Sequence, residues 1–268
     1  VCFFDPSMLN IIAARAEMEA DLRTGLRRHE FRLFYQPQVN SAGKWLGAEA
    51  LLRWQHPQKG MISPAEFIPL AEETGLIIPI GKWVLHHACA QLAAWQSDPV
   101  SAALTMSVNV SAKQFRQDDF VATVRKALQD SGLEPACLEL EITESVTMAG
   151  SALFEQRLAE LKQLGVSIAI DDFGTGFSSL SYLDKLPANR LKIDRAFVAQ
   201  IDSSSGPRIA ELIIQLGKKL NLAVIAEGIE SQKHWDYLKN AGCQEGQGYF
   251  IGMPMLEADL MNWIKTDR

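Results

Sequence analysis

Residues 31–54 read FRLFYQPQVNSAGKWLGAEALLRW, and this stretch limits how the chain can fold. Two strand-like runs, 31–39 and 45–54, are separated only by the five residues from Asn40 to Lys44. A loop of that length cannot contain the crossover that parallel strands need, so we predict an antiparallel hairpin. The second run also places Glu49 among apolar residues, where a carboxylate is costly unless it is paired or bound to a cation.

Beyond this hairpin, strand-like runs alternate with helical patterns to the end of the chain. Further strands are predicted at residues 104–110, 138–143, 166–171, 190–194, 222–227 and 244–250. Ser63 and Glu66 form a capping-box pattern with Pro64 at the first helical position, which predicts a helix over residues 64–74. The other main helices are predicted at residues 76–95, 120–130, 152–164, 208–220, 232–240 and 258–265.

Eight strands with intervening helices in a chain of 268 residues are typical of a (β/α)8 barrel, so we predict an α/β protein of this architecture. A doubly wound sheet is the alternative, because the alternation alone does not separate the two. Residues 13–30 have apolar side chains at helical spacing, and residues 1–4 resemble the end of a strand. We interpret residues 1–18 as the remnant and linker helix of an upstream domain, and residues 19–268 as the barrel.

Composition narrows the classes of function. The chain has 47% hydrophobic and 22% charged residues, as expected of a globular protein. It has no apolar run long enough to cross a bilayer. Its four scattered cysteines lack CxxC spacing, which disfavours zinc sites and disulfides and suggests a cytoplasmic protein. The net charge of −6 disfavours binding to nucleic acid or to an anionic membrane, so an anionic substrate would need local positive charge.

Polar side chains interrupt otherwise apolar strands near their ends. These residues are Glu49, Asn109, Glu141, Asp171, Asp172, Lys192 and Glu227. A parallel strand that is covered on both faces should be apolar almost throughout. Any one of these groups could belong to a structural salt bridge, but the pattern repeats in six strands. Because the carboxyl ends of barrel strands converge on one face, we expect the groups to share a single pocket.

The expected pocket contains only oxygen ligands apart from Lys192, with neither histidine nor cysteine. Carboxylate and amide oxygens are suited to Mg²⁺ or Mn²⁺. Five carboxylates carry more charge than one divalent ion neutralises, so we predict two metal ions, roughly 3.5–4 Å apart, in the arrangement used for phosphoryl displacement. Lys192 would add a cation that holds a water or a phosphate oxygen. The glycine-containing loop that starts at Asp171 lacks a GKS or GKT sequence, which disfavours a P-loop; we expect a mobile loop that orders around the metals.

Eight ordered motifs between about residue 20 and residue 254 carry a resemblance to a known family. They are FYQP (34–37), GAEALLRW (47–54), SVNVS (107–111), EITES (141–145), DDFGTG (171–176), LKID (191–194), AEGIE (226–230) and QGYF (247–250). With them the chain resembles the EAL-domain family of cyclic di-GMP phosphodiesterases. The resemblance implies a modified TIM barrel with an antiparallel first strand, and a metal-dependent hydrolysis of cyclic di-GMP to linear pGpG.

The resemblance also implies roles for single residues. Two Mg²⁺ or Mn²⁺ ions would be bound by Glu49, Asn109, Glu141, Asp171, Asp172 and Glu227. Lys192 would be the catalytic lysine that orients or activates water, and Glu227 would have general-base character as well. Gln36, Arg53, Asp194 and Gln247 would contact the substrate, and Glu144 would anchor the loop that follows Asp172. The sequence leaves three alternatives open: a receptor that binds cyclic di-GMP without cleaving it, a barrel enzyme acting on another phosphodiester, or an enolase-like acid/base enzyme.

The resemblance extends to partners. We expect a homodimer, and an upstream GGDEF or sensory domain whose end corresponds to the first residues of this chain. Neither nucleic acid nor membrane contact is expected for this segment. The intact set of matching residues favours catalysis over a receptor role.

Overall fold

The computed structural model describes residues 6–98, 101–144, 152–174, 183, 186–203 and 208–266. Its strands are β1 (Phe31–Asn40), β2 (Trp45–His56), β3 (Gly60–Ile62), β4 (Thr105–Val110), β5 (Leu138–Thr143), β6 (Ser167–Phe173), β7 (Arg190–Ile193), β8 (Ala223–Ala226) and β9 (Glu245–Gly246). Its α-helices are α1 (Pro6–Arg27), α2 (Pro64–Thr74), α3 (Ile77–Trp95), α4 (Ala112–Phe115), α5 (Phe120–Ser131), α7 (Ala152–Leu164), α9 (Arg195–Ala199), α10 (Arg208–Leu220), α11 (Gln232–Ala241) and α12 (Glu257–Thr266). Two short 3-10 helices, η1 (Pro135–Cys137) and η2 (Gln200–Asp202), complete the described elements.

The strands close into a barrel. Their order is β1-β9-β8-β7-β6-β5-β4-β2, and β1 pairs in turn with β2, while β3 extends the far side of β2. β1 is antiparallel to both of its neighbours, and the pairs from β2 through β4 to β9 are parallel. Both the barrel and the antiparallel hairpin predicted from the sequence are therefore confirmed, and the doubly wound sheet is excluded.

The hairpin turn explains why β1 runs against the other strands. The Asn40 side-chain oxygen accepts hydrogen bonds from the backbone N–H groups of Ala42 and Lys44, at 3.0 and 2.8 Å. Gly43 has φ of +79°, a conformation that glycine adopts without steric cost. These five residues therefore reverse the chain with their own hydrogen bonds, and leave no length for a crossover helix.

The last predicted strand is the one that differs most from expectation. Residues 244–250 were predicted to be extended, but β9 contains only Glu245 and Gly246. After β9, Gln247 N–H still donates to Ala226 O of β8 at 2.9 Å, but the chain then bonds to a loop residue: Ile229 N–H donates to Gln247 O at 3.1 Å, and Phe250 N–H donates to Ile229 O at 2.9 Å. A Cβ on Gly248 would lie 2.2 Å from the Ile229 backbone, so a glycine is needed for this close approach. The short strand β3 and the short helices α4 and α9 were not predicted as elements.

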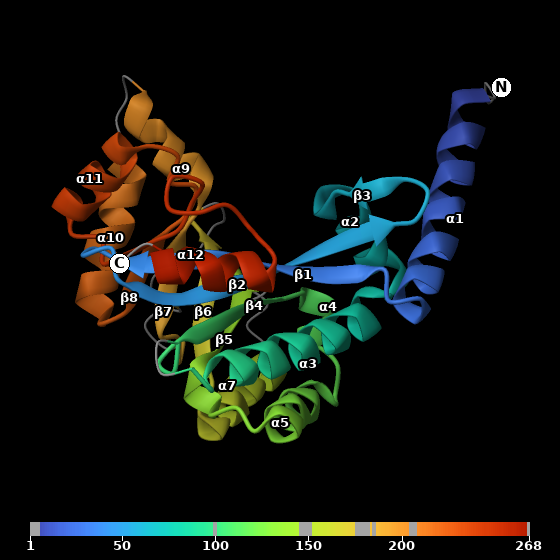
Figure 1. Cartoon of the computed structure of the whole chain (residues 1–268), viewed down its shortest axis with the longest axis horizontal. Helices are drawn as coiled ribbons and strands as arrows, with labels where there is room; N and C mark the ends of the chain where they lie inside the picture. Colours follow the sequence, from blue (N-terminus) through green and yellow to red (C-terminus); the bar gives the residue numbers. More distant parts are fainter. Residues whose placement is uncertain are drawn as a thin grey trace.

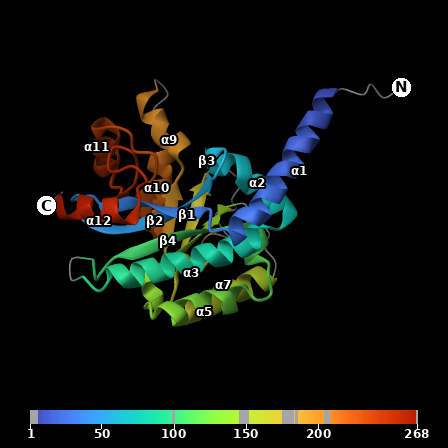
Figure 2. The ribbon, with the colours of Figure 1, turned by 45° about the vertical axis from the view of Figure 1, so that its right-hand side comes forward.

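The helices begin and end within a few residues of the predicted positions. Ser63 caps α2 by accepting a hydrogen bond from the Ala65 N–H at 3.3 Å, with Pro64 at the first helical position. α10 buries Ala210, Ile213, Ile214 and Gly217, the spacing expected of a helix with one face against a sheet. In both views α3, α5 and α7 lie next to one another on one side of the sheet (Figures 1 and 2).

The N-terminal part of α1 projects away from the barrel, and its C-terminal part packs against it near α2, where Leu22 is fully buried (Figures 1 and 2). Its contact with the β2–β3 turn includes ion pairs of Lys59 with Glu17 and Asp21, at 2.7 and 2.8 Å. The helix begins at Pro6, earlier than predicted, and the strand expected at residues 1–4 lies outside the described residues. Among the described helices, none combines the length and apolarity needed to cross a membrane.

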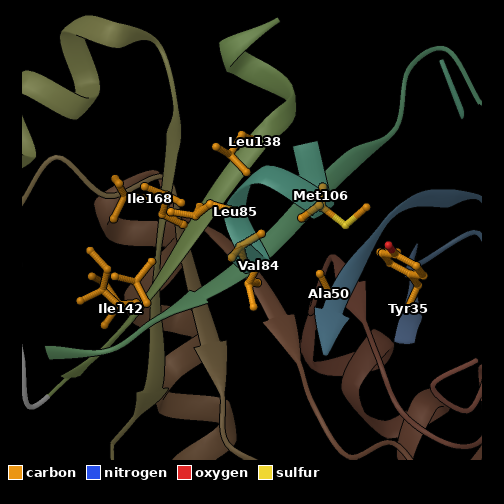
Figure 3. Close-up of a cluster of buried hydrophobic side chains, with 14 of the residues drawn as sticks. Tyr35, Ala50, Val84, Leu85, Met106, Leu138, Ile142 and Ile168 are labelled. Atoms are coloured by element: carbon orange, nitrogen blue, oxygen red, sulfur yellow. The ribbon is translucent and has the colours of Figure 1, made fainter. Parts of the chain in front are cut away.

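The core lies between the barrel strands and the helices that cover them. Side chains from α3, such as Val84 and Leu85, meet Met106, Leu138 and Ile168 from successive strands (Figure 3). The hairpin brings its own aromatic cluster to this core. The Phe31, Trp54 and Phe67 rings pack with centroids 5.6 to 6.0 Å apart, and Phe67 is fully buried. This cluster packs the end of the hairpin that lies opposite the turn against α2.

We predict that Phe67→Ala lowers the free energy of unfolding by about 3–5 kcal/mol, because it leaves a cavity between the hairpin and α2. Urea unfolding followed by circular dichroism measures the change. Leu212→Ala is the control: Leu212 is 63% exposed, so the change should stay within about 0.5 kcal/mol. An equal loss in the two variants would show that the aromatic cluster does not hold the hairpin in place.

Candidate active site

Carboxylates from four strand ends surround one buried ammonium group. Lys192 Nζ lies 2.6 Å from Glu141 Oε2 and 2.6 Å from Glu227 Oε1. It lies 3.4 Å from Asp171 Oδ1 and 3.9 Å from Glu49 Oε1. The lysine side chain is 1% exposed. The convergence expected from the repeated strand pattern is therefore present, with Lys192 at its centre.

Register explains why these side chains meet. Asn109 is opposite Glu141 on β5, and Thr143 is opposite Asp171 on β6. Glu227 follows β8 directly, and its N–H donates to Ile193 O at 3.1 Å. Asn109 and Asp171 thus lie late in their strands and Glu227 directly after β8, while Glu49 lies within the long strand β2 beside β4, and the neighbouring strands bring these groups together.

Both oxygens of Glu49 are fixed by amide donors. Asn109 Nδ2 donates to Oε1 at 2.6 Å, and Gln247 Nε2 donates to Oε2 at 2.5 Å. Gln247 also donates to Gln36 Oε1 at 3.0 Å. Since the Asn109 amide nitrogen points at Glu49, its carbonyl oxygen is the candidate ligand for a cation. Gln36 and Gln247, predicted as substrate contacts, lie beside a predicted metal ligand.

Asp171 and Asp172 are adjacent in sequence but differ in their surroundings. Successive strand residues point to opposite faces, so Asp171 and Asp172 could not both reach the pocket from a regular strand. The β6–β7 pairing shifts register between Ile170 and Phe173, and Asp172 has φ of +53°. Such a bulge redirects side chains. Asp172 is half-buried and lies against Asp194, and burial, Asp171 and Asp194 together raise its pKa to about 6.

The acidic cluster perturbs its own titration. Burial raises the pKa of Glu227 to about 8, although the charge of Lys192 opposes the rise. Burial and the nearby Glu49 raise the pKa of Glu141 well above its usual range. Burial alone would lower the pKa of Lys192, but the surrounding carboxylates raise it well above its usual range. Burial also opposes ionisation of Glu49, yet Lys192 and the amide donors lower its pKa. The cluster therefore holds more negative charge than one ammonium balances.

The oxygen atoms of these side chains are chemically suited to binding a hard divalent cation. Within the described part of the chain, both Glu141 carboxylate oxygens and Glu227 Oε1 are buried without a hydrogen-bond donor. Lys192 Nζ forms ion pairs with Glu141 Oε2 and Glu227 Oε1. Among the same residues, no three His, Cys, Asp or Glu side chains are arranged to hold a metal ion, and Lys192 Nζ contacts both Glu141 and Glu227. The candidate ligands are those predicted, Glu49, Asn109, Glu141, Asp171, Asp172 and Glu227, and their ligation of metal stays a prediction.

A cavity of about 280 Å³ opens beside the cluster. Its lining includes Gln36, Glu49, Arg53, Arg195, Glu227, Glu230, Gln247 and Tyr249. Arg53 lies 5.6 Å above the Phe34 ring and donates to Leu52 O at 2.8 Å. Arg195 and Tyr249 were not predicted as site residues, although Arg195 directly follows the LKID motif and Tyr249 lies within the QGYF motif. The two arginines place positive charge at the mouth of an acidic pocket.

Two other predicted residues have local structural contacts. Glu144 Oε2 accepts a hydrogen bond from Gly174 N–H at 2.8 Å, which ties it to the segment after Asp172. Asp194 Oδ1 accepts from Ala196 N–H at 2.8 Å and so caps α9, in addition to lying near Asp172. A substrate contact of Asp194 stays a prediction. The loop expected to order around the metals continues into residues 175–182, outside the described residues.

The comparisons with known proteins agree with this geometry. The model of the EAL domain family matches residues 19–254. The chain belongs to the EAL domain family. It is 45% identical to the bifunctional diguanylate cyclase/cyclic di-GMP phosphodiesterase MucR of Pseudomonas aeruginosa, over 97% of this chain and 38% of MucR. It is 34% identical to the cyclic di-GMP phosphodiesterase PdeR of Escherichia coli, over 98% of this chain and 40% of PdeR.

The EAL fold is equally clear among solved structures. The structure described as PaMucR phosphodiesterase in complex with c-di-GMP aligns with a TM-score of 0.88 at 45% identity, covering 91% of this chain and 99% of that one. The FimX EAL domain aligns with a TM-score of 0.81 at 26% identity, covering 89% of this chain and 96% of that one. The chain spans less than half the length of MucR and PdeR.

We predict that Mg²⁺ binding to this EAL domain releases protons. In the metal-free protein the pKa of Glu227 is about 8, so below that pH a cation must displace its proton. The apparent Mg²⁺ affinity should fall as the pH is lowered from 8.5 to 6.5, by up to about tenfold per pH unit for each proton released. Calorimetry in two buffers of different ionisation heat counts these protons, and Glu227→Gln should reduce their number. A pH-independent affinity without proton release would contradict the prediction.

We further predict that Lys192→Met destabilises the metal-free protein by about 3–5 kcal/mol at pH 8, because it leaves buried carboxylates without their counter-charge. Mg²⁺ should then raise the melting temperature of this variant more than that of the wild type, since it replaces the lost cation. Lys219→Met, at an exposed helical position, is the control and should behave as the wild type. Equal metal-free stabilities of Lys192→Met and wild type would disprove the role of Lys192 as internal counter-ion.

Proposed function

We propose that this EAL domain hydrolyses cyclic di-GMP to linear pGpG with two divalent ions, Mg²⁺ or Mn²⁺. The observation that carries the proposal is the convergence of Glu49, Glu141, Asp171 and Glu227 around Lys192, next to a cavity. The names of MucR and PdeR supply the substrate class, and the intact acidic set favours catalysis over a receptor role.

The residues would divide the reaction as follows. Bound divalent ions would supply a Lewis acid for water and charge neutralisation at phosphorus. Glu227 reaches both the carboxylate cluster and the cavity, so it is suited to accept the proton of the attacking water. The water oxygen bonds to phosphorus, the bond to the 3′ oxygen breaks, and that oxygen takes up a proton. Lys192 would hold the water or a phosphate oxygen against the strand ends.

Substrate binding has to overcome repulsion between two phosphates and an acidic pocket. Arg53 and Arg195 at the cavity supply positive charge for this purpose. Gln36 and Gln247, held by their mutual hydrogen bond, offer fixed polar groups on the same side. Asp194 is the remaining proposed substrate contact, and Glu144 the anchor of the loop after Asp172.

The setting of the domain is part of the proposal. MucR is described as a bifunctional diguanylate cyclase/cyclic di-GMP phosphodiesterase, and this chain matches only 38% of its length. We therefore place residues 1–18 as a linker from an upstream GGDEF or sensory domain, with residues 19–268 as the EAL domain, in a homodimer. The free thiols of Cys89, Cys137 and Cys243 suit the cytoplasm.

We predict that the chain converts cyclic di-GMP to pGpG in Mg²⁺ and stops when EDTA is added, as followed by chromatography. Glu49→Ala, Asp171→Asn and Lys192→Ala should each abolish turnover in saturating Mg²⁺, because each removes a member of the cluster. Asp236→Asn is the control, since Asp236 is an exposed partner of Lys239 and should leave the rate unchanged.

Three results would contradict this function. Metal-independent binding of cyclic di-GMP without product would indicate a receptor. Near-normal rates in any of the three variants would remove that residue from the reaction. Faster turnover of another phosphodiester, which cyclic di-GMP fails to inhibit, would reassign the substrate.

A further inference from the structure

A second glutamine of β1, Gln38, lies two residues after Gln36, which is paired with the predicted metal ligand Glu49. Its side chain is 1% exposed and points into the barrel below Gln36. Both hydrogens of its amide have acceptors: Nε2 donates to Gln247 Oε1 at 2.9 Å and, at the outer limit of a hydrogen bond, to Ser107 Oγ at 3.5 Å. Gln38 is thus placed between the substrate-side amides and the base of the barrel.

Residues at the base of the barrel determine which atoms donate and which accept in these hydrogen bonds. Arg190 can only donate, and its guanidinium pairs with Glu139 and, at 2.8 Å, with Glu245. Glu139 Oε1 also accepts from the Ser107 hydroxyl at 2.8 Å. Because that hydroxyl proton is committed to Glu139, Ser107 offers Gln38 a lone pair. The amide nitrogen of Gln38, and not its oxygen, must face Ser107.

The orientation of the Gln38 amide determines the orientation of the Gln247 amide, which contacts Glu49. Since Gln38 presents N–H to Gln247, Gln247 must present its carbonyl oxygen in return. Its two N–H groups are then left for Gln36 and for Glu49 Oε2, at 3.0 and 2.5 Å. A Gln247 amide turned the other way would set its carbonyl against two acceptors, with a free energy cost comparable to a lost buried hydrogen bond at each.

We propose that Gln38 is a positioning residue for Glu49: it fixes the orientation of the Gln247 amide, and through it the carboxylate that would bind metal. This inference rests on the proposed function, because it concerns the affinity of that site for divalent cations. A purely structural role of the buried polar chain is the competing explanation. That role would lower stability without changing how tightly the folded protein binds Mg²⁺.

The test compares Gln38→Met with the wild type. Methionine matches glutamine in length and flexibility but cannot donate to Gln247, so the Gln247 amide loses the bond that orients it. Mg²⁺ binding to the metal-free protein is measured by calorimetry well below the melting temperature, and the rate of cyclic di-GMP turnover is titrated with Mg²⁺. Ser101→Ala is the matched control, because Ser101 is fully buried, donates to Trp95 O at 2.6 Å, and is not part of the chain of bonds to Glu49.

We expect the Mg²⁺ dissociation constant of Gln38→Met to rise about tenfold, the lower end of the effect of removing groups that orient metal ligands. Excess Mg²⁺ should restore most of the turnover rate. Ser101→Ala should lose stability and keep the affinity of the wild type. If Gln38→Met does not fold, Ser107→Ala replaces it, with a smaller rise in the dissociation constant expected because Gln38 keeps its bond to Gln247.

The outcomes separate the two proposals. Wild-type protein that fails to bind Mg²⁺ would overturn the proposed function and this inference with it. Wild-type protein that binds Mg²⁺, with Gln38→Met or its replacement Ser107→Ala binding equally well, would overturn the inference alone. A loss of affinity shared by Ser101→Ala would likewise assign the effect to general destabilisation.

Discussion

Repulsion between carboxylates at one end of the barrel is the constraint on which this structure depends. Four acidic side chains lie within 3.9 Å of one nitrogen, Lys192 Nζ. A single ammonium cannot balance them, and burial together with the neighbouring carboxylates raises the pKa values of Glu141 and Glu227. The pocket is therefore under-neutralised by its own residues, which is the state that favours binding of divalent cations.

The antiparallel hairpin gives this pocket its polar wall. Because β1 runs against β2, Gln36 stands directly opposite Glu49. Gln38 follows two residues later on the same face of the strand. A βα unit at this position would have replaced the short turn by a helix, and the next strand would have entered from the other end. The reversal of one strand thus supplies two amides that organise the acidic cluster, while α2 and the aromatic cluster around Phe67 hold the hairpin's far end.

The sequence predicted the barrel and the convergence for identifiable physical reasons. Short loops exclude crossovers, and polar residues late in buried strands have to meet at one face. It did not predict the early end of β9, because the close approach of Gly248 to Ile229 is a tertiary contact with no local signal. Nor did it predict that Lys192 stands at the centre of the carboxylates, or that Gln38, Ser107, Glu139 and Arg190 form a directed chain behind Glu49. Periodicity identifies the face of a strand, but the pairing of buried polar groups depends on packing between strands.

The most direct measurement is a crystal structure of the protein grown with Mn²⁺, with an anomalous difference map at the manganese edge. A shared cation site predicts anomalous density among Glu49, Asn109, Glu141 and Asp171, with Lys192 Nζ moved from its central position. A map without density there, in crystals that contain Mn²⁺ and with Lys192 still between Glu141 and Glu227, would contradict the binding of divalent cations by this cluster.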